Sequence, residues 1–355
     1  MAEQPAGLVT IGVDTHKHTH VAVAIGNIGE RLGDLTIPAD RGGYEQLLRW
    51  ARSLGKVNRF GIEGTGSYGQ GLTSYLRRHD QKIVEVTRPD RRDRRQRGKS
   101  DTLDAENAAR TAMAGIAAAT PRRAEGTSEI LRQVKVARDV AVKSRTMAII
   151  TLKTLIVTAP DELRQELQPL PKAALRDRCA GLRPGPVTTP LAACKHSLRS
   201  LARRWQDLDA EIAAHDEIID DLTQQAAPQM REAFGIGPDT AAEMLILAGD
   251  QPQERLKSEA AFAMLCGAAP IPASSGMKQR HRLNRAGHRQ ANSALYRTAI
   301  VRMRFHPATI AYAQKRREEG KTNRDITRCL KRYIAREIYH YLTTEPDPGA
   351  PPSQP

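Results

Sequence analysis

Apolar and polar residues alternate along the first part of the chain with the period of β-strands. The runs at residues 8–14, 20–25 and 31–38 are short and rich in β-branched or alternating apolar residues, which predicts three strands. The segments between these runs are too short to hold a crossover helix. We therefore expect the three strands to form an antiparallel meander.

Helical and strand-like patterns follow the meander in turn. Three antiparallel strands followed by this alternation give the element order of a ribonuclease H-like fold, and we predict an α/β domain of that class over residues 1–122. The spacing predicts helices at 42–54, 72–79 and 101–115, separated by strands at 59–63 and 82–86.

The middle of the chain has helical spacing over a much longer stretch. Residues 128–157 have the pattern of one long helix, with Ser128 as its N-cap and Pro160 as a stop signal just beyond its end. Residues 159–190 carry several prolines and no clear period, which predicts a linker or an irregular insertion.

Apolar residues after this insertion follow the heptad spacing of a coiled coil. His215 occupies one seam position, and we interpret it as a polar residue that sets the register rather than as a metal ligand. The two long helices are expected to form a hairpin or to pair between subunits, so residues 123–228 are predicted to be a coiled-coil and linker region. The seam consists of Leu198, Leu201, Trp205, Leu208, Ile212, His215, Ile219 and Leu222.

A compact helical domain is expected over residues 229–342, followed by a Pro-rich tail at 343–355 that is expected to be disordered. Within this domain, residues 234–250 resemble a helix-hairpin-helix element, in which Gly235 and Gly237 form a tight turn. Backbone amides at the start of the next helix could then hold a DNA phosphate. A plain turn between two helices is the alternative.

The charge of the chain indicates a polyanionic partner. Lys and Arg number 55 against 40 for Asp and Glu, a formal net charge of +15, which favours nucleic acid. Aromatic residues make up only 4% of the chain, so contacts to backbone phosphates are expected rather than base-stacking platforms.

The cysteines and the apolar runs indicate where such a protein works. The four cysteines are far apart and lack zinc spacing, so they are expected to be free thiols in a reducing compartment. No apolar run approaches membrane-spanning length, and the first residues have no signal-peptide character. We expect a soluble, cytoplasmic protein without a membrane partner.

The stretch "IEGTGSYGQG" at residues 62–71 contains the glycine spacing of a dinucleotide-binding loop. Glu85 lies about 20 residues beyond it, where a ribose-binding acid is expected. However, a dinucleotide fold places its glycine loop after the first strand, and this loop follows the fourth predicted strand. A nicotinamide enzyme is therefore the weaker interpretation, and Glu63, just before the glycines, becomes the residue of interest.

Four carboxylates are expected to meet in the predicted α/β domain. Asp14 ends the first strand, Glu63 ends the fourth, and Asp101 and Asp104 share one helical face. Neighbouring carboxylates repel one another, and divalent metal ions offset that repulsion. Two Mg²⁺ ions about 4 Å apart can activate an attacking oxygen and stabilise a leaving oxygen at a phosphodiester. Taken singly, each acid could instead be a solvated end residue, and Asp101 could be an N-cap.

Two basic stretches accompany these acids. Seven basic residues lie between Arg88 and Lys99, and a second group surrounds the Ser-Ser-Gly turn at residues 274–276. A serine hydroxyl is a weak nucleophile unless it is activated, and nearby guanidinium groups could stabilise a phosphorane-like transition state. The predicted nucleic-acid contacts are Arg91, Arg92, Arg94, Arg95, Arg97, Lys99, Gly235, Gly237, Lys278, Arg280, Arg282, Arg285 and Arg289.

Four motifs in this order carry a family resemblance that covers nearly the whole chain. They are "GVDTHK", "EGTGSYG", "KSDTLDAENAAR" and "PIPASSG…RHRLNRAGHRQAN". The chain resembles the DEDD transposases of bacterial insertion sequences, which are bridge-RNA-guided recombinases related to Piv-type DNA invertases. The resemblance implies a RuvC-like first domain, a coiled-coil linker and a helical transposase domain with a catalytic serine.

The resemblance also implies roles for individual residues and partners. Asp14, Glu63, Asp101 and Asp104 become ligands of Mg²⁺, for which Mn²⁺ can substitute, and Ser275 rather than Ser274 becomes the nucleophile that forms a transient phosphoserine link to DNA. His288 departs from the family pattern, which usually has Asn or Asp at this position. The implied partners are DNA, a structured noncoding guide RNA and further copies of the chain, from dimer to tetramer.

Two other functions remain open on the sequence. A RuvC-like Holliday-junction resolvase or structure-specific nuclease would use the four acids alone, without the serine. A non-catalytic DNA-binding protein would use only the basic stretches and the hairpin.

Overall fold

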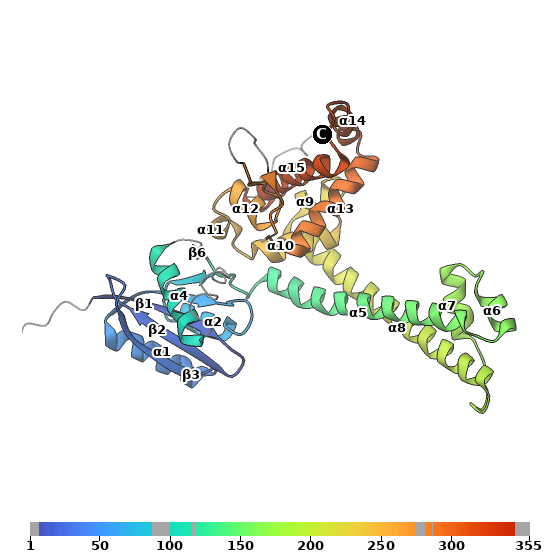
Figure 1. Cartoon of the computed structure of the whole chain (residues 1–355), viewed down its shortest axis with the longest axis horizontal. Coiled ribbons are helices and arrows are strands. Elements are labelled where there is room, and N and C mark those ends of the chain that lie inside the picture. The colour runs from blue at the N-terminus through green and yellow to red at the C-terminus, as the bar shows by residue number, and fades with distance from the viewer. Residues whose placement is uncertain (1–6, 87–99, 116–117, 275–280, 286, 345–355) are drawn as a thin grey trace, which may run out of the picture. The chain divides into compact units, whose positions relative to one another are not determined.

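The computed structural model describes residues 7–86, 100–115, 118–274, 281–285 and 287–344 (Figure 1). The chain divides into two compact units, of which the first comprises residues 1–124 with 248–257 and the second comprises the remainder. None of the helices in the described ranges is long and apolar enough to cross a membrane.

A mixed β-sheet forms the centre of the first unit. Strands β1 (Leu8–Thr15), β2 (Thr19–Ile25) and β3 (Arg31–Pro38) pair antiparallel, which confirms the predicted meander. Strand β4 (Lys56–Glu63) lies parallel to β1, and β5 (Ile83–Val86) lies parallel to β4. The order β3-β2-β1-β4-β5 is compatible with the predicted ribonuclease H-like fold, and a two-residue β6 (Ala118–Ala119), too short to predict, extends its edge.

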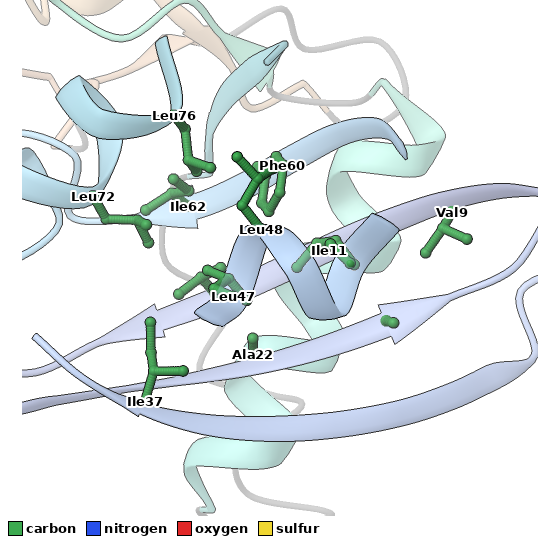
Figure 2. Packing of buried hydrophobic residues seen from close by; sticks show 13 residues of the cluster. Val9, Ile11, Ala22, Ile37, Leu47, Leu48, Phe60, Ile62, Leu72 and Leu76 are labelled. Carbon is green, nitrogen blue, oxygen red and sulfur yellow. The ribbon is translucent and has the colours of Figure 1, made fainter. Parts of the chain in front are cut away.

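One face of this sheet carries the main core of the first unit. Helices α1 (Arg41–Leu54) and α2 (Gln70–Arg78) bring Leu47 and Leu72 against Ile11 of β1, Phe60 of β4 and their neighbours, as Figure 2 shows. Full burial of each large apolar side chain contributes about 1.5–3 kcal/mol. Because side chains alternate along a strand, this core fixes which residues of β1 and β4 point to the opposite face.

Helix α4 (Asp101–Ala114) covers that opposite face at very short distance. A Cβ added to Gly12 of β1 would lie 2.0 Å from the carbonyl oxygen of Ala105, and one added to Gly61 of β4 would lie 2.6 Å from that of Ala108. The helix presents small side chains to the sheet, including the buried Ala109 and Ala112. Glycine on the strands and alanine on the helix therefore set how closely the two can pack.

The N-cap of α4 is not Asp101, the residue that the sequence left open as a possible cap. Ser100, not Asp101, is the N-cap, since its side chain accepts a hydrogen bond from the Leu103 amide at 3.2 Å. Gly115 ends the helix in the left-handed conformation, with φ at 65°. Asp101 is consequently the first helical residue, and its carboxylate is not used to cap the helix.

Two long helices form a hairpin in the second unit. Helix α5 (Thr127–Val157) packs along α8 (Pro190–Ala226) (Figure 1). Of the two expected arrangements, the structure shows the hairpin within one chain. Arg145 joins the helices through an ion pair with Asp209 at 2.7 Å. The prediction that Ser128 caps α5 was wrong, because Gly126 occupies the N-cap without a side-chain hydrogen bond.

The segment predicted as a linker or irregular insertion is largely helical. Helices α6 (Asp161–Leu167) and α7 (Lys172–Ala180) each begin directly after a proline, which serves as the N-cap residue. Their buried side chains, among them Leu163 and Leu175, join a core with α5 and α8. The expectation of irregular structure failed because helices of seven and nine residues are too short to display a period.

The rest of the second unit is mostly helical, as expected. A small antiparallel hairpin of β7 (Ile271–Pro272) and β8 (His281–Arg282), which was not predicted, interrupts it. The helices are α9 (Pro228–Glu232), α10 (Pro238–Ala248), α12 (Glu259–Leu265), α13 (Arg289–Phe305), α14 (Pro307–Glu318) and α15 (Asn323–Thr343), while α11 (Pro252–Arg255) belongs to the first unit.

A buried lysine ties α10 to α5. The Lys135 ammonium lies 2.6 Å from Asp239, 3.2 Å from Glu243 and 3.3 Å from Asp139, and its side chain is only 7% exposed. Burial opposes ionisation of Asp239, but the hydrogen bond and charge of Lys135 outweigh it and lower the pKa of the Asp239 carboxyl below its ordinary value. This cation therefore depends on the acids around it.

Replacing Gly12 with alanine is expected to lower the free energy of unfolding by about 1–3 kcal/mol, because the new Cβ meets helix backbone that cannot rotate away. Urea denaturation followed by circular dichroism measures the change. Gly33→Ala on β3 is the matched control, since its Cβ would make only an ordinary contact of 3.7 Å with Trp50. Equal effects of the two substitutions would contradict close packing of α4 at Gly12.

Asp239→Asn is expected to lower the free energy of unfolding by about 2 kcal/mol at pH 7, since Lys135 loses its shortest ion pair. The folded pKa of Asp239 is lowered, so the difference from wild type is present above about pH 4 and disappears as pH falls through the folded value. Urea titrations across pH 3–7 measure it. The control Asp216→Asn removes a more exposed partner of Arg138 and should cost under about 1 kcal/mol.

Candidate metal centre

The acids of β1 and β4 meet at one edge of the sheet. Asp14 lies near the end of β1 and Glu63 is the last residue of β4. The two strands are parallel neighbours, with Val13 opposite Ile62 in their register. Asp14 and Glu63 alternate with the core residues Val13 and Ile62, so they share the α4 side with Gly12 and Gly61.

The first turn of α4 brings the other two acids to this edge. Asp101 and Asp104 both lie in that turn, and Asp104 is 6% exposed. Asp101 is more accessible, with 50% of its side chain exposed. The helix N-terminus carries a partial positive charge that favours acids in its first turn.

His16 joins the acids, although the sequence interpretation did not assign it a role. Its Nε2 lies 3.2 Å from Asp14 and 3.4 Å from Asp101. Asp14, His16 and Asp101 each offer one ligand atom within 4.8 Å of the others. The signal was present in the motif "GVDTHK", where His16 follows Asp14 by two residues, directly after the end of β1.

The electrostatics of Asp14 reflect all of these neighbours. Burial is the main cause that raises the pKa of its carboxyl above the ordinary value, and His16 opposes this effect. The carboxylates of Glu63, Asp104 and Asp101 raise the same pKa further. The four predicted acids therefore interact at one place, and their mutual repulsion disfavours the fully ionised state.

The donor set fits a divalent cation. His16 Nε2 is buried and, within the described part of the chain, has no hydrogen-bond partner of suitable geometry, although two carboxylates lie near it. Oxygen-rich sites suit Mg²⁺ and Mn²⁺, and an added imidazole suits transition ions such as Mn²⁺ more than Mg²⁺. A bound cation would satisfy this nitrogen and offset the repulsion that raises the pKa of Asp14.

The glycine segment after β4 holds the site together. Thr15 donates a hydrogen bond to the carbonyl oxygen of Glu63 at 2.8 Å, which links the ends of β1 and β4. Gly64 has φ at 72°, and its carbonyl oxygen accepts from the amide of Gly69 at 3.1 Å. Gly66 is exposed beside them. Two of the three glycines thus serve the turn itself, and the position of the segment after the fourth strand speaks against a dinucleotide loop.

Many of the predicted nucleic-acid contacts and the favoured serine lie outside the described residues. This group comprises Arg91, Arg92, Arg94, Arg95, Arg97, Lys99, Ser275, Lys278 and Arg280.

The described members of the second basic group lie around the β7–β8 hairpin. Arg282, Arg285 and Arg289 are exposed, as is Ser274. His288 is the N-cap of α13, where its Nδ1 accepts from the Ala291 amide at 3.4 Å. A histidine can therefore provide the capping acceptor that Asn or Asp would supply at this position.

The predicted helix-hairpin-helix segment begins with a tight turn. Gly235 has φ at 78°, and the Ile236 amide donates to the carbonyl oxygen of Ala233 at 3.0 Å. Gly237 has open space where a side chain would be, just before α10. These features suit a turn between helices, and the phosphate-binding role of Gly235 and Gly237 stays a prediction.

Two family models match separate parts of the chain. Residues 11–159 match a family model described as "DEDD_Tnp_IS110: Transposase", and residues 227–314 match one described as "Transposase IS116/IS110/IS902 family". The first match contains Asp14, Glu63, Asp101 and Asp104, and the second contains the β7–β8 hairpin.

A protein of Streptomyces coelicolor, the "Insertion element IS110 uncharacterized 43.6 kDa protein", is similar to part of the chain. The two are 29% identical over 143 residues, which cover 40% of this chain and 33% of that protein. The matching part of the chain thus spans about a third of the length of this curated relative.

Divalent metal is expected to raise the midpoint of thermal unfolding of the wild type by about 5–10 °C when present at 100 times its Kd. Asp14→Asn should raise the metal-free midpoint, because it removes a buried repelling carboxylate, and should abolish most of the metal-dependent rise. Differential scanning fluorimetry with Mn²⁺ or Mg²⁺ measures both. Asp34→Asn, on an exposed acid of β3, should keep the full rise.

Proposed function

Because the chain belongs to the IS110 family of transposases, we propose that it cuts and rejoins DNA at the ends of an insertion sequence. The observation that carries this proposal is the convergence of four acids and a histidine at one sheet edge, inside the region that matches a DEDD transposase model. The reaction is a transfer of phosphodiester bonds between strands, with no net hydrolysis.

The acids hold the metal in this proposal. Asp14, Glu63, Asp101 and Asp104 bind Mg²⁺ or Mn²⁺, and His16 lies where it can add a nitrogen ligand. When bound, the metal supplies a Lewis acid for phosphate oxygens and stabilises developing charge on the leaving oxygen. Thr15 and the segment after β4 hold the backbone carbonyl of Glu63. This keeps the carboxylates in place before DNA binds.

Ser275 is the proposed nucleophile, with Ser274 as the alternative. Its hydroxyl oxygen attacks phosphorus, so that a serine–phosphate bond forms while the bond from phosphorus to a deoxyribose oxygen breaks. The leaving oxygen takes up a proton and becomes a hydroxyl, and the serine proton passes to a base. A second DNA hydroxyl then reverses these steps at the phosphoserine, which restores the serine and joins the new strand pair.

The partners are proposed from charge and from family membership. The basic stretches around residues 88–99 and 278–289 would contact DNA phosphates at the element ends and the target. A structured noncoding guide RNA would choose the target by base pairing, so that the protein reads strand geometry more than sequence. Two to four copies of the chain would assemble on DNA, with α5 and α8 as coiled-coil elements and Gly235 and Gly237 as a further phosphate contact.

The proposed function is tested by scoring excision of the element in cells, with PCR across the joined ends. Wild type should form junctions, whereas Asp14→Ala and Ser275→Ala should reduce them by at least about a hundredfold, because metal binding and the nucleophile are both required. Ser274→Ala should stay active and serves as the matched control.

Protein levels must be equal in all strains for this comparison. Junctions formed by Ser275→Ala but not by Asp14→Ala would overturn the serine mechanism and favour strand transfer by metal-activated hydroxyls. Linear cleavage without any junctions, unchanged in Ser275→Ala, would instead identify a nuclease that uses the acids alone.

A further inference from the structure

A small cavity lies within the second unit, apart from the acid cluster. It has a volume of about 230 Å³ and is bounded by residues 267–270, by residues 282–284 beside β8 and by one face of α15. Common small-molecule sites are larger, at about 300–1,000 Å³. This cavity is therefore too small for a whole dinucleotide cofactor.

The cavity is strongly cationic. Arg282, Arg328, Lys331 and Arg332 all line it, and none of the described residues in its lining is acidic. Arg328 pairs with Asp325, and Arg332 pairs with Glu259, each at 3.1 Å.

The other two cations of the lining are not neutralised in this way. No acid of the described chain pairs with Lys331 or Arg282. These two positive charges line the cavity without an acidic partner among the residues that the structure describes, which favours an anionic ligand.

Lys331 is held in place by a network of hydrogen bonds. It is 8% exposed, and its ammonium donates to the side-chain oxygen of Asn292 at 3.0 Å. The amide nitrogen of Asn292 donates in turn to the carbonyl oxygens of Cys266 and Gly267, both at 3.0 Å, which fixes the orientation of the Asn292 side chain. Burial, together with the charge of Arg328, lowers the pKa of Lys331, and an arriving anion would relieve that cost.

The cavity also has an apolar and aromatic side. Leu283 and Tyr333 line it and remain 48% and 49% exposed. Tyr312 packs edge-on against Tyr333, with ring centroids 5.9 Å apart at 84°, so the plane of the Tyr333 ring is set in advance. An oriented aromatic ring beside cations is the combination that binds a base and its phosphate together.

We propose that this cavity receives one unpaired nucleotide of a nucleic-acid strand, with its phosphate on Lys331 and Arg282 and its base against Tyr333 and Leu283. The inference rests on the proposed function, since it requires a chain that handles nucleic-acid strands. Arg282 belongs to β8, which pairs with β7, and Ser274 follows β7 by two residues. A nucleotide bound here would therefore lie beside the strand pair that Ser274 follows.

Oligonucleotide binding tests the proposal without any dependence on cleavage. Full-length Asp14→Ala protein, free of metal, would be titrated with labelled single-stranded DNA, single-stranded RNA and duplex DNA of one sequence, followed by fluorescence anisotropy. Single strands should bind more tightly than the duplex, since a base must leave its stack to enter the cavity. The difference between the DNA and RNA arms identifies which strand is the source of the nucleotide.

Removal of the buried charge should weaken this binding. Lys331→Met is expected to lower single-strand affinity about tenfold and to reduce the slope of log K against log salt by about 0.7–1. Arg324→Met is the matched control, because Arg324 is exposed on α15 but does not line the cavity, and its affinity should stay within about twofold. Unchanged affinity and slope in Lys331→Met would overturn the proposal.

A second measurement needs no substitution and so does not depend on the variant folding. Cys329 lines the cavity and is partly exposed, whereas Cys194 is partly exposed elsewhere in the second unit. Saturating oligonucleotide should slow alkylation of Cys329 by at least about fivefold and leave Cys194 unchanged, as read by mass spectrometry. Equal rates at Cys329 with and without oligonucleotide would refute occupancy of the cavity, whatever the outcome of the excision assay.

Discussion

The close contact between α4 and the sheet is the constraint on which the first unit depends. Two strand glycines and a row of helix alanines let the backbones approach until a single added carbon would collide with main chain. That approach carries the first turn of α4, with Asp101 and Asp104, to the strand ends that hold Asp14 and Glu63. The main core on the other face keeps β1 and β4 in register, so packing on both faces of the sheet determines the geometry of the acids.

Much of this arrangement could be predicted from residue patterns. The period of two along β1 and β4 and the spacing of three in "DTLD" place the acids correctly without any knowledge of distances. His16 was missed because a lone histidine beyond the end of a strand has no period, and its approach to Asp101 is a tertiary contact. The α6–α7 region was missed because its stability comes from burial against α5 and α8, which short sequence windows do not reveal.

The acid cluster lowers the stability of the fold. A buried carboxylate surrounded by others is costly, as the raised pKa of Asp14 indicates, and the fold tolerates it because the core beneath is apolar and well packed. Lys135 in the second unit is the opposite case, since three carboxylates neutralise it and it connects two helices. Lys331 differs from both, because its ammonium donates a hydrogen bond to the amide oxygen of Asn292 rather than to an acid.

The pairing of β1 with β4 has a consequence for the order of folding. Asp14, Glu63 and Asp104 come from segments far apart in the sequence, and the loops between them must close before the packing of β4 and α4 against β1 repays the lost chain entropy. A meander of β1, β2 and β3 can form early from local contacts, but the acids meet only when β4 has joined and α4 has docked. A nascent or partly folded chain therefore holds its carboxylates apart, and the four-acid cluster is absent until the whole domain has been made.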